Sequence, residues 1–380
     1  MKWSLRLGSV AGIGVFLHWP FSLLIIWVLV ASIKQGQAWL EAVRAVGFVL
    51  AIFGCVVLHE LGHALTARRY GIDTQDIVLL PIGGVARLER MPQKPMQEFW
   101  VAIAGPAVNA VIALALLGIL ALAGSSQLIF DVAFVEGNLL ARLLWVNVFI
   151  GVFNLLPAFP MDGGRILRAL LSTKMRRQKA TNAAASLGQV LAVGLGFLGF
   201  LGNPILIFIA IFIYLGAEAE AKHTEFTTAL EGLSVKDGMQ TRFRTLQLHD
   251  TLAEAVDQLL AGSQVDFPVL DDGRIVGMLS RQDLIRNLAE RGKTAEVSAA
   301  MTGDGKTVDV GANLVATMDE MHHGKRSSLP VVRNGELVGL LTSENVSELV
   351  MVRNAQKREP TRTAQHPNGV SGAALPAEPR

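Results

Sequence analysis

The chain has 380 residues, of which 51% are hydrophobic and 17% are charged, and its formal net charge is +2. Soluble domains carry roughly 25% charged residues, so this composition excludes an ordinary soluble globule. The small net charge indicates little about partners, and we expect no nucleic acid among them. The single cysteine, Cys55, excludes an intramolecular disulfide.

Long apolar runs fill residues 1–220, and they predict six membrane-spanning helices, each near the roughly 20 residues that cross a bilayer. The first run is irregular, because "GSVAGIGVFLHWPF" contains several glycines and a proline; its beginning is expected to be a strand or a re-entrant piece. No small-residue cleavage site ends this run, so we expect a retained segment. The expected spans are 10–33, 45–66, 99–123, 139–157, 184–201 and 204–220.

Basic residues are distributed unevenly among the loops between these spans. Thirteen precede the first span, separate the second from the third, or follow the fourth, whereas only Lys34 and Arg44 lie in the alternate loops. Short cytoplasmic loops are enriched in Lys and Arg. The bias predicts that both termini are cytoplasmic and that the second span carries its histidines toward the cytoplasmic end.

The second span contains "VVLHELGHAL" at 56–65, with His59, Glu60 and His63 in one turn. An ionisable side chain at the bilayer centre costs about 3 kcal/mol or more, so such residues mark functional sites. Histidines at i and i+4 share one helix face and can bind one metal ion. A glutamate beside them can take a proton from metal-bound water. The alternative is a chance motif, which is usual on exposed helices but unfavourable in an apolar one.

A third ligand is expected from "FNLLPAFPMDGGR" at 153–165. Pro157 and Pro160 cannot continue a regular helix, and unpaired backbone at membrane depth requires a protein-covered or wet site. This break directs Asp162 toward an interior polar site. The alternative is that Asp162 only caps the following helix.

These two segments resemble the site-2 proteases, a family of intramembrane zinc metalloproteases. The match consists of His59-Glu60-x-x-His63 and of Asn154-Leu-Leu-Pro with Met-Asp162-Gly. The resemblance implies that His59, His63 and Asp162 ligate Zn²⁺ and that Glu60 activates water. It also implies that Asn154 holds the scissile carbonyl or its oxyanion, although an interhelical hydrogen bond would explain Asn154 equally well.

Two further segments extend the resemblance. "AIAGPAVNA" at 102–110 is similar to the third span of the family, where small residues allow close helix packing. "DIVLLPIGGVARLER" at 76–90 reads as a strand, a glycine-containing turn and a second strand, a small β-hairpin that the resemblance places near the active site. Its free edge can hold a substrate in extended form by strand addition.

Residues 232–352 contain an internal repeat with a constant offset of 62. "FPVLDDGRIVGMLSRQDL" at 267–284 aligns with "LPVVRNGELVGLLTSENV" at 329–346. Each copy predicts a helix, a strand, a turn at Gly273 or Gly335, a second strand and a helix. The copies resemble a pair of CBS motifs, as in the prokaryotic site-2 proteases that carry CBS domains.

The CBS resemblance implies that Ser280 and Asp283 contact the ribose of an adenine nucleotide, AMP or ATP. The second copy has Thr342 and Asn345 at these positions, so the first site is the better candidate. A purely structural or dimerising module is the alternative, because a fold alone does not specify a ligand.

The sequence therefore predicts a polytopic α-helical membrane protein of the cell membrane with a C-terminal cytoplasmic α/β CBS-pair domain. We expect a zinc metalloendopeptidase that cuts single-span membrane proteins in regulated intramembrane proteolysis, with a possible homodimer through the CBS domains. A CBS-regulated divalent metal transporter or channel is the alternative. The expected domains are a protease at 1–222, CBS motifs at 232–290 and 294–352, and a disordered, polar tail at 353–380.

Overall fold

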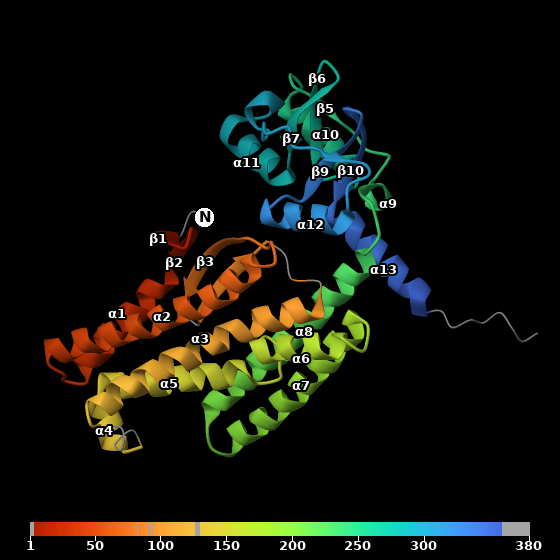
Figure 1. The fold of residues 1–380 in the computed structure, drawn as a ribbon. Helices are drawn as coiled ribbons and strands as arrows, with labels where there is room; N and C mark the ends of the chain where they lie inside the picture. Colours follow the sequence, from red (N-terminus) through yellow and green to blue (C-terminus); the bar gives the residue numbers. More distant parts are fainter. Residues whose placement is uncertain (1–3, 82, 90–91, 93, 126–129, 359–380) are drawn as a thin grey trace, which may run out of the picture. The chain divides into compact units, whose positions relative to one another are not determined.

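The computed structural model describes residues 4–81, 83–89, 92, 94–125 and 130–358 (Figure 1). The chain divides into two compact units, Met1–Glu225 and Phe226–Arg380. The division falls inside helix α8 (Pro204–Leu230). Each unit is described by itself below.

Helices make up most of the first unit, because its apolar runs satisfy their backbone groups within each helix. Among the described residues, α2, α3, α7 and α8 are long and apolar enough to cross a membrane, whereas α1 and α5 are apolar but shorter. The six predicted spans are thus represented by four helices of spanning length and two shorter ones. Their bounds are α1 Pro20–Lys34, α2 Trp39–Arg68, α3 Pro95–Leu122, α4 Val132–Gly137, α5 Leu139–Asn154, α6 Asp162–Ser172 and α7 Arg177–Leu201.

The first predicted run, 10–33, is helical only in its second half, and the strand expected at its irregular beginning is confirmed. Strands β1 (Ser4–Val10) and β2 (Ile13–His18) occupy this region, and the helix begins only at Pro20. The glycines and the proline that made the segment irregular explain the difference, since they favour a turn and then a helix start.

A four-stranded sheet in the described chain has the order β1-β2-β3-β4. Strands β3 (Thr74–Leu80) and β4 (Gly83–Leu88) cover the segment predicted as two strands and pair antiparallel, with Ile77 opposite Ala86. Strand β2 pairs parallel with β3, and β4 lies at the sheet edge beside α2.

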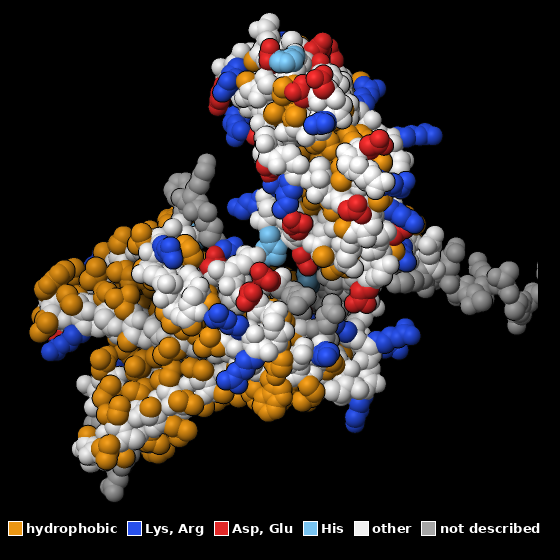
Figure 2. All heavy atoms as spheres, turned by 45° about the horizontal axis from the view of Figure 1, so that its top comes forward, with side chains coloured by type: hydrophobic (Ala, Val, Ile, Leu, Met, Phe, Trp, Pro, Cys, Tyr) orange, Lys and Arg blue, Asp and Glu red, His pale blue; other side chains and the backbone are white. Residues whose placement is uncertain are grey.

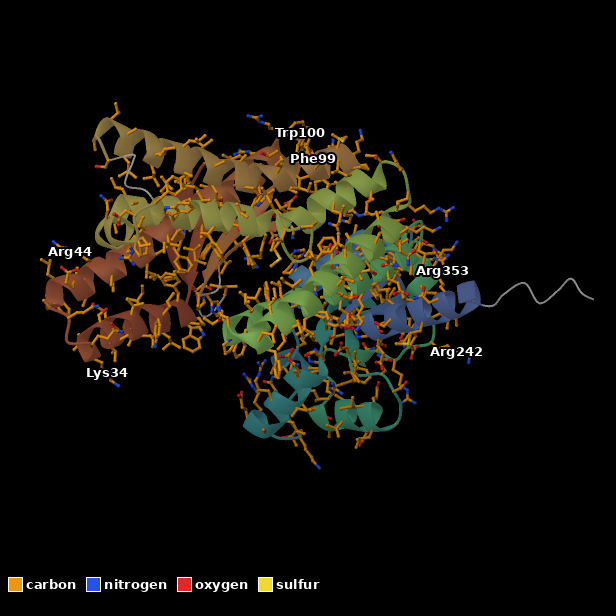
Figure 3. The ribbon with its side chains drawn as sticks, turned by 90° about the horizontal axis from the view of Figure 1, so that it is seen from below. Lys34, Arg44, Phe99, Trp100, Arg242 and Arg353 are labelled. Atoms are coloured by element: carbon orange, nitrogen blue, oxygen red, sulfur yellow. The ribbon has the colours of Figure 1, made fainter. Side chains whose placement is uncertain are left out.

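Helix α3 packs against α2, α5 and α6, and Figure 1 shows it alongside α2 and α5. Small residues permit this approach: a Cβ at Gly62 of α2 would lie 2.8 Å from the carbonyl oxygen of Ala104 in α3. Apolar side chains cover the outer surface of these helices, as Figure 2 shows. Figure 3 shows Lys34, at the end of α1, and Arg44, near the start of α2, at the end of the bundle remote from Phe99 and Trp100 of α3.

The second unit contains the repeat as two copies of helix, strand, strand and helix, as predicted. Sheets of the described residues have the orders β5-β6-β7 and β10-β9-β8. The elements are α9 Val235–Gly238, β5 Leu246–Gln247, α10 Leu252–Leu260, β6 Phe267–Asp271, β7 Arg274–Leu279, α11 Arg281–Arg291, the 3₁₀ helix Val297–Ala299, β8 Val308–Asp309, α12 Leu314–His323, β9 Ser328–Arg333, β10 Glu336–Thr342 and α13 Ser343–Arg358.

Both β-hairpins turn on two residues with positive φ, Asp272-Gly273 and Asn334-Gly335. This is the conformation of a type I′ turn, for which Asp-Gly and Asn-Gly are favoured sequences. The predicted turns at Gly273 and Gly335 are confirmed.

The two copies exchange their first segments. Gln240, near the start of the first copy, bridges to Leu340 of β10, and Thr302, near the start of the second copy, bridges to Met278 of β7. Val235 accordingly belongs to the apolar core of the second copy rather than of the first. Each copy therefore needs the other to complete its fold.

Helix α13 continues to Arg358, and Arg353 donates a hydrogen bond of 2.8 Å to the carbonyl oxygen of Ala229. The predicted disorder over 353–380 is thus wrong for residues 353–358, because this basic end of the helix is held by tertiary contact. Residues 359–380 lie outside the described part of the chain.

Candidate metal centre

His59 and His63 lie one turn apart on α2, and both side chains are buried. The Nδ1 atom of His63 lies 2.7 Å from the carbonyl oxygen of Val101 in α3. A backbone carbonyl can only accept, so the hydrogen of His63 lies on Nδ1 and its Nε2 carries a lone pair.

Asp162 reaches the same point from a distant part of the chain. Helix α5 ends at Asn154, the following residues leave helical geometry, and α6 begins at Asp162. A Cβ at Gly163 would lie 2.2 Å from the carbonyl oxygen of Leu156, so this chain reversal requires glycine. Within the described residues no side chain caps α6, which leaves the Asp162 carboxylate directed at the histidines rather than at its own helix.

Three ligand atoms meet in this buried site. The Nε2 atom of His63 lies 3.1 Å from Nε2 of His59 and 3.1 Å from Oδ2 of Asp162, and the His59 Nε2–Asp162 Oδ2 distance is 3.3 Å. Ligands about 2.0–2.1 Å from a tetrahedral zinc ion are roughly 3.3 Å apart. All three atoms are hydrogen-bond acceptors, and none of them carries a hydrogen that it could donate to the others. A cation between them would satisfy all three.

Helix α3 forms the wall behind the histidines. A Cβ at Gly105 would lie 2.2 Å from His63 Nε2 and 2.7 Å from His59 Cε1, so only glycine leaves the ligand atoms free. The small residues at 102–110 predict close helix packing, but that pattern does not show that Gly105 also shapes the site.

Two buried asparagines that are not among the predicted site residues are connected to His59. The Oδ1 atom of Asn109 in α3 contacts His59 Nδ1, and its Nδ2 lies 3.1 Å from Oδ1 of Asn147 in α5. Both asparagines are fully buried. The sequence signal that could have identified them is an asparagine inside an apolar span, because a buried amide requires a polar partner.

Glu60 points away from this pair of asparagines and toward the sheet. Its Oε2 atom accepts a hydrogen bond of 3.0 Å from the backbone N–H of Ala86 in β4. The approach is close, since a Cβ at Gly84 would lie 2.9 Å from Glu60 Cγ. Strand β4 therefore lies along the face of α2 that carries Glu60.

Asn154 is the last residue of α5 and is half-buried. The acidic and histidine side chains of the described residues that could hold a metal ion are His59, His63 and Asp162. The predicted role of Asn154 at the scissile carbonyl stays a prediction.

A second buried polar cluster connects four helices of the first unit. Arg168 of α6 donates to Glu98 of α3 and to Glu220 of α8, and its guanidinium carbon lies 5.0 Å from the ring centroid of Phe159. Arg177 of α7 lies 3.1 Å from Glu98. The helix that begins at Asp162 is thus held by charges on α3 and α8.

In the second unit, Ser280 and Asp283 contact each other at the start of α11. The Ser280 hydroxyl donates to Asp283 Oδ2 over 2.7 Å and accepts from the Asp283 backbone N–H over 3.1 Å. Thr342 and Asn345 repeat this contact, and Gln240 also donates to Asn345 Oδ1 over 2.7 Å. Asp283 also accepts from the exposed Arg286, so each of the two side chains is engaged by two donors within the chain.

Comparison with known proteins agrees with this architecture. A model of peptidase family M50 matches residues 47–135 and 132–195, and a model of the CBS domain matches 234–290 and 296–352.

The chain is 38% identical over 280 residues to zinc metalloprotease MJ0392 of Methanocaldococcus jannaschii, covering 73% of this chain and 78% of the relative. It is 30% identical over 392 residues to the putative zinc metalloprotease Rip3 of Mycobacterium tuberculosis, covering 96% and 97%. The solved site-2 protease from Methanocaldococcus jannaschii is 41% identical, with 58% of this chain and 95% of that chain covered and a TM-score of 0.43. The chain therefore belongs to peptidase family M50, the site-2 proteases, as a zinc metalloprotease that carries CBS domains.

Proposed function

We propose that this protein cuts peptide bonds of single-span membrane proteins at a zinc ion held by His59, His63 and Asp162. The observation that carries the proposal is the convergence of three buried acceptor atoms, at mutual distances of 3.1–3.3 Å, beside a glutamate in an apolar helix. Bound zinc acidifies a coordinated water and polarises the scissile carbonyl.

Glu60 then acts as the general base. Its carboxylate takes a proton from the attacking water and delivers it to the leaving amine. The hydrogen bond from Ala86 holds this carboxylate on the side of α2 that faces β4. Asn154, at the end of α5, supplies an amide donor to the carbonyl oxygen as negative charge develops there.

Strand β4 receives the substrate in extended form. It pairs with β3 on one side and forms an edge of the sheet on the other. The Ala86 N–H donates to Glu60 on the edge side. A peptide added to this edge would run past the catalytic glutamate. A helical peptide bond is shielded, so unwinding onto β4 would expose it to attack.

The test compares the purified protein with Glu60→Gln on a panel of single-span membrane substrates and measures bound zinc in both. We expect cleavage by the wild type only, with zinc retained in the variant. Equal cleavage by the variant would contradict the role of Glu60. If neither protein cuts and zinc crosses liposomes equally with both, a CBS-regulated metal transporter or channel replaces the protease proposal.

The CBS pair is proposed to bind AMP or ATP at Ser280 and Asp283 and to alter cleavage. A physical route exists along α8, because Glu220 lies five residues before the unit division and is ion-paired with Arg168 of α6. A shift of α8 would therefore act on the helix that begins at Asp162.

This regulation is tested by titrating AMP and ATP against the full chain while following nucleotide binding and cleavage. Asp283→Asn should abolish the response, whereas Asp271→Asn, at an exposed position of β6, should preserve it. Absence of binding at millimolar nucleotide would leave the CBS pair a structural or dimerising module.

We further propose a cell-membrane protein with cytoplasmic termini and CBS domains, and a homodimer formed through those domains. The orientation is supported by the thirteen-to-two bias of basic residues between alternate loops. The homodimer is proposed only from the resemblance of the repeat to CBS pairs. The test introduces single cysteines at Lys34 and Lys179, with Cys55 replaced, and adds an impermeant reagent outside the cell. The cysteine at position 34 should be labelled, and the cysteine at position 179 should not.

A further inference from the structure

We infer that Asn109 and Asn147 are positioning residues that keep the hydrogen of His59 on Nδ1, so that Nε2 presents its lone pair to the metal. The inference rests on the metal site proposed above. Three buried, uncharged side chains, His59 of α2, Asn109 of α3 and Asn147 of α5, form this hydrogen-bonded relay.

The direction of the relay is set at its far end, by a backbone carbonyl. Asn147 Nδ2 lies 2.9 Å from the carbonyl oxygen of Leu143, one turn earlier on α5, and 3.4 Å from Sγ of Cys55. A carbonyl oxygen can only accept a hydrogen bond, so the Asn147 amide nitrogen must point toward it. The Oδ1 atom of Asn147 consequently points toward α3.

The same logic fixes the next amide. Asn147 Oδ1 is an acceptor, so the atom 3.1 Å from it must be the donor Nδ2 of Asn109. Asn109 Oδ1 then faces His59 Nδ1 and accepts its hydrogen. The remaining ring nitrogen, Nε2, is the one that meets His63 Nε2 and Asp162 Oδ2.

The two histidines thus reach the same tautomer by different routes. His63 donates directly to the backbone carbonyl of Val101, whereas His59 depends on two side chains. A backbone carbonyl cannot turn around, but an asparagine amide can, and then it would offer a donor to His59. Asn147 and Leu143 prevent this reversal. Cys55 completes the relay as the second contact of the Asn147 amide nitrogen.

A packing role for the asparagines predicts a different result from a positioning role, and Asn109 separates them. Asn109→Leu keeps the branched shape of the side chain but removes the acceptor for His59. Asn109→Asp keeps that acceptor but removes the donor to Asn147. Positioning requires only the first contact to survive, whereas interhelical packing requires the second.

The experiment measures zinc affinity of the full chain in detergent by competition with a chelator, with helical content checked by circular dichroism. Loss of a side chain that orients a metal ligand typically lowers affinity 10–100-fold, which is the effect expected for Asn109→Leu. Asn109→Asp should stay within about threefold of the wild type, because carboxylates also orient metal-bound histidines. Asn182→Leu, at an exposed position of α7, is the matched control and should bind zinc normally.

Asn147→Leu tests the relay beyond Asn109. It should also lower zinc affinity, by less than Asn109→Leu, because the freed Asn109 amide spends only part of its time reversed. Normal zinc affinity in a folded Asn109→Leu protein, or an equal loss in Asn109→Asp, would overturn the inference. A wild type that binds no zinc would instead refute the proposed metal site, so the two failures are distinguishable.

Discussion

The two units use polar side chains in opposite ways. In the first unit, the motif residues His59 and Asp162 are 103 positions apart, yet their ligand atoms lie 3.3 Å from each other in a buried site. In the second unit, Ser280 and Asp283 are three positions apart and satisfy each other at a helix start. In apolar surroundings a polar group needs a partner from another part of the chain, so a cluster of such groups indicates a functional site. A solvated motif can be satisfied locally, without any ligand.

The largest effect is expected for Gly105→Ala. The new methyl group would lie 2.2 Å from His63 Nε2, where a metal would bind, and the neighbouring contact is a ring rather than a flexible chain end. We expect loss of both zinc and cleavage. Gly118→Ala, on the same helix with no atom near its added Cβ, should behave like the wild type. Zinc content and cleavage of the two purified variants provide the measurement, and zinc retained by Gly105→Ala would show that the first unit tolerates a displaced α3.

The next effect is a difference in unfolding free energy between the loss of a buried ion pair and the loss of an exposed one. Arg168 is 1% exposed, and Arg168→Met would leave Glu98 buried beside a single, partly exposed arginine. Breaking such a buried pair costs about 3–5 kcal/mol of unfolding free energy. Arg286→Met removes an exposed partner of Asp283 and should cost less than about 1 kcal/mol.

Denaturant titrations of the two variants in the same detergent give both values. Similar losses for Arg168→Met and Arg286→Met would mean that the Arg168 cluster contributes no more than a surface pair, and the contrast between the units would not extend to their charges.

The smallest effect concerns pH and the capping box that opens the second unit. The Ser234 backbone N–H and hydroxyl donate to Asp237 over 2.9 and 2.8 Å, and they hold the pKa of that carboxyl below its ordinary value. The folded unit therefore favours ionised Asp237. Its stabilisation is complete above the unfolded pKa of about 3.9 and is lost as pH falls through the lower folded pKa.

Because Asp237 is exposed, the change should be small. Unfolding midpoints between pH 6 and pH 3 should fall slightly less in Asp237→Asn than in the wild type, after both are referred to their values at pH 6. A larger fall in Asp237→Asn would contradict the sign of this contribution.

Much of the fold was predictable from local pattern. The apolar runs predicted the helices, and the offset of 62 predicted two copies with turns at Asp272-Gly273 and Asn334-Gly335. His59 and His63 could be paired from sequence because a helix brings i and i+4 onto one face. These features depend on neighbours within a few residues, which is why one sequence suffices to find them.

Other features were decided only by tertiary structure. The pairing of β2 with β3, the exchange of segments between the CBS copies and the close approach at Gly105 depend on partners far along the chain. So does the relay of Asn109 and Asn147, whose residues belong to separate helices. Periodicity shows which face of a helix is apolar, but it does not show which other helix covers that face. The sequence by itself therefore determined the helices, the repeat and the candidate ligands, whereas only the packing of α2, α3, α5 and α6 decided how those ligands are oriented.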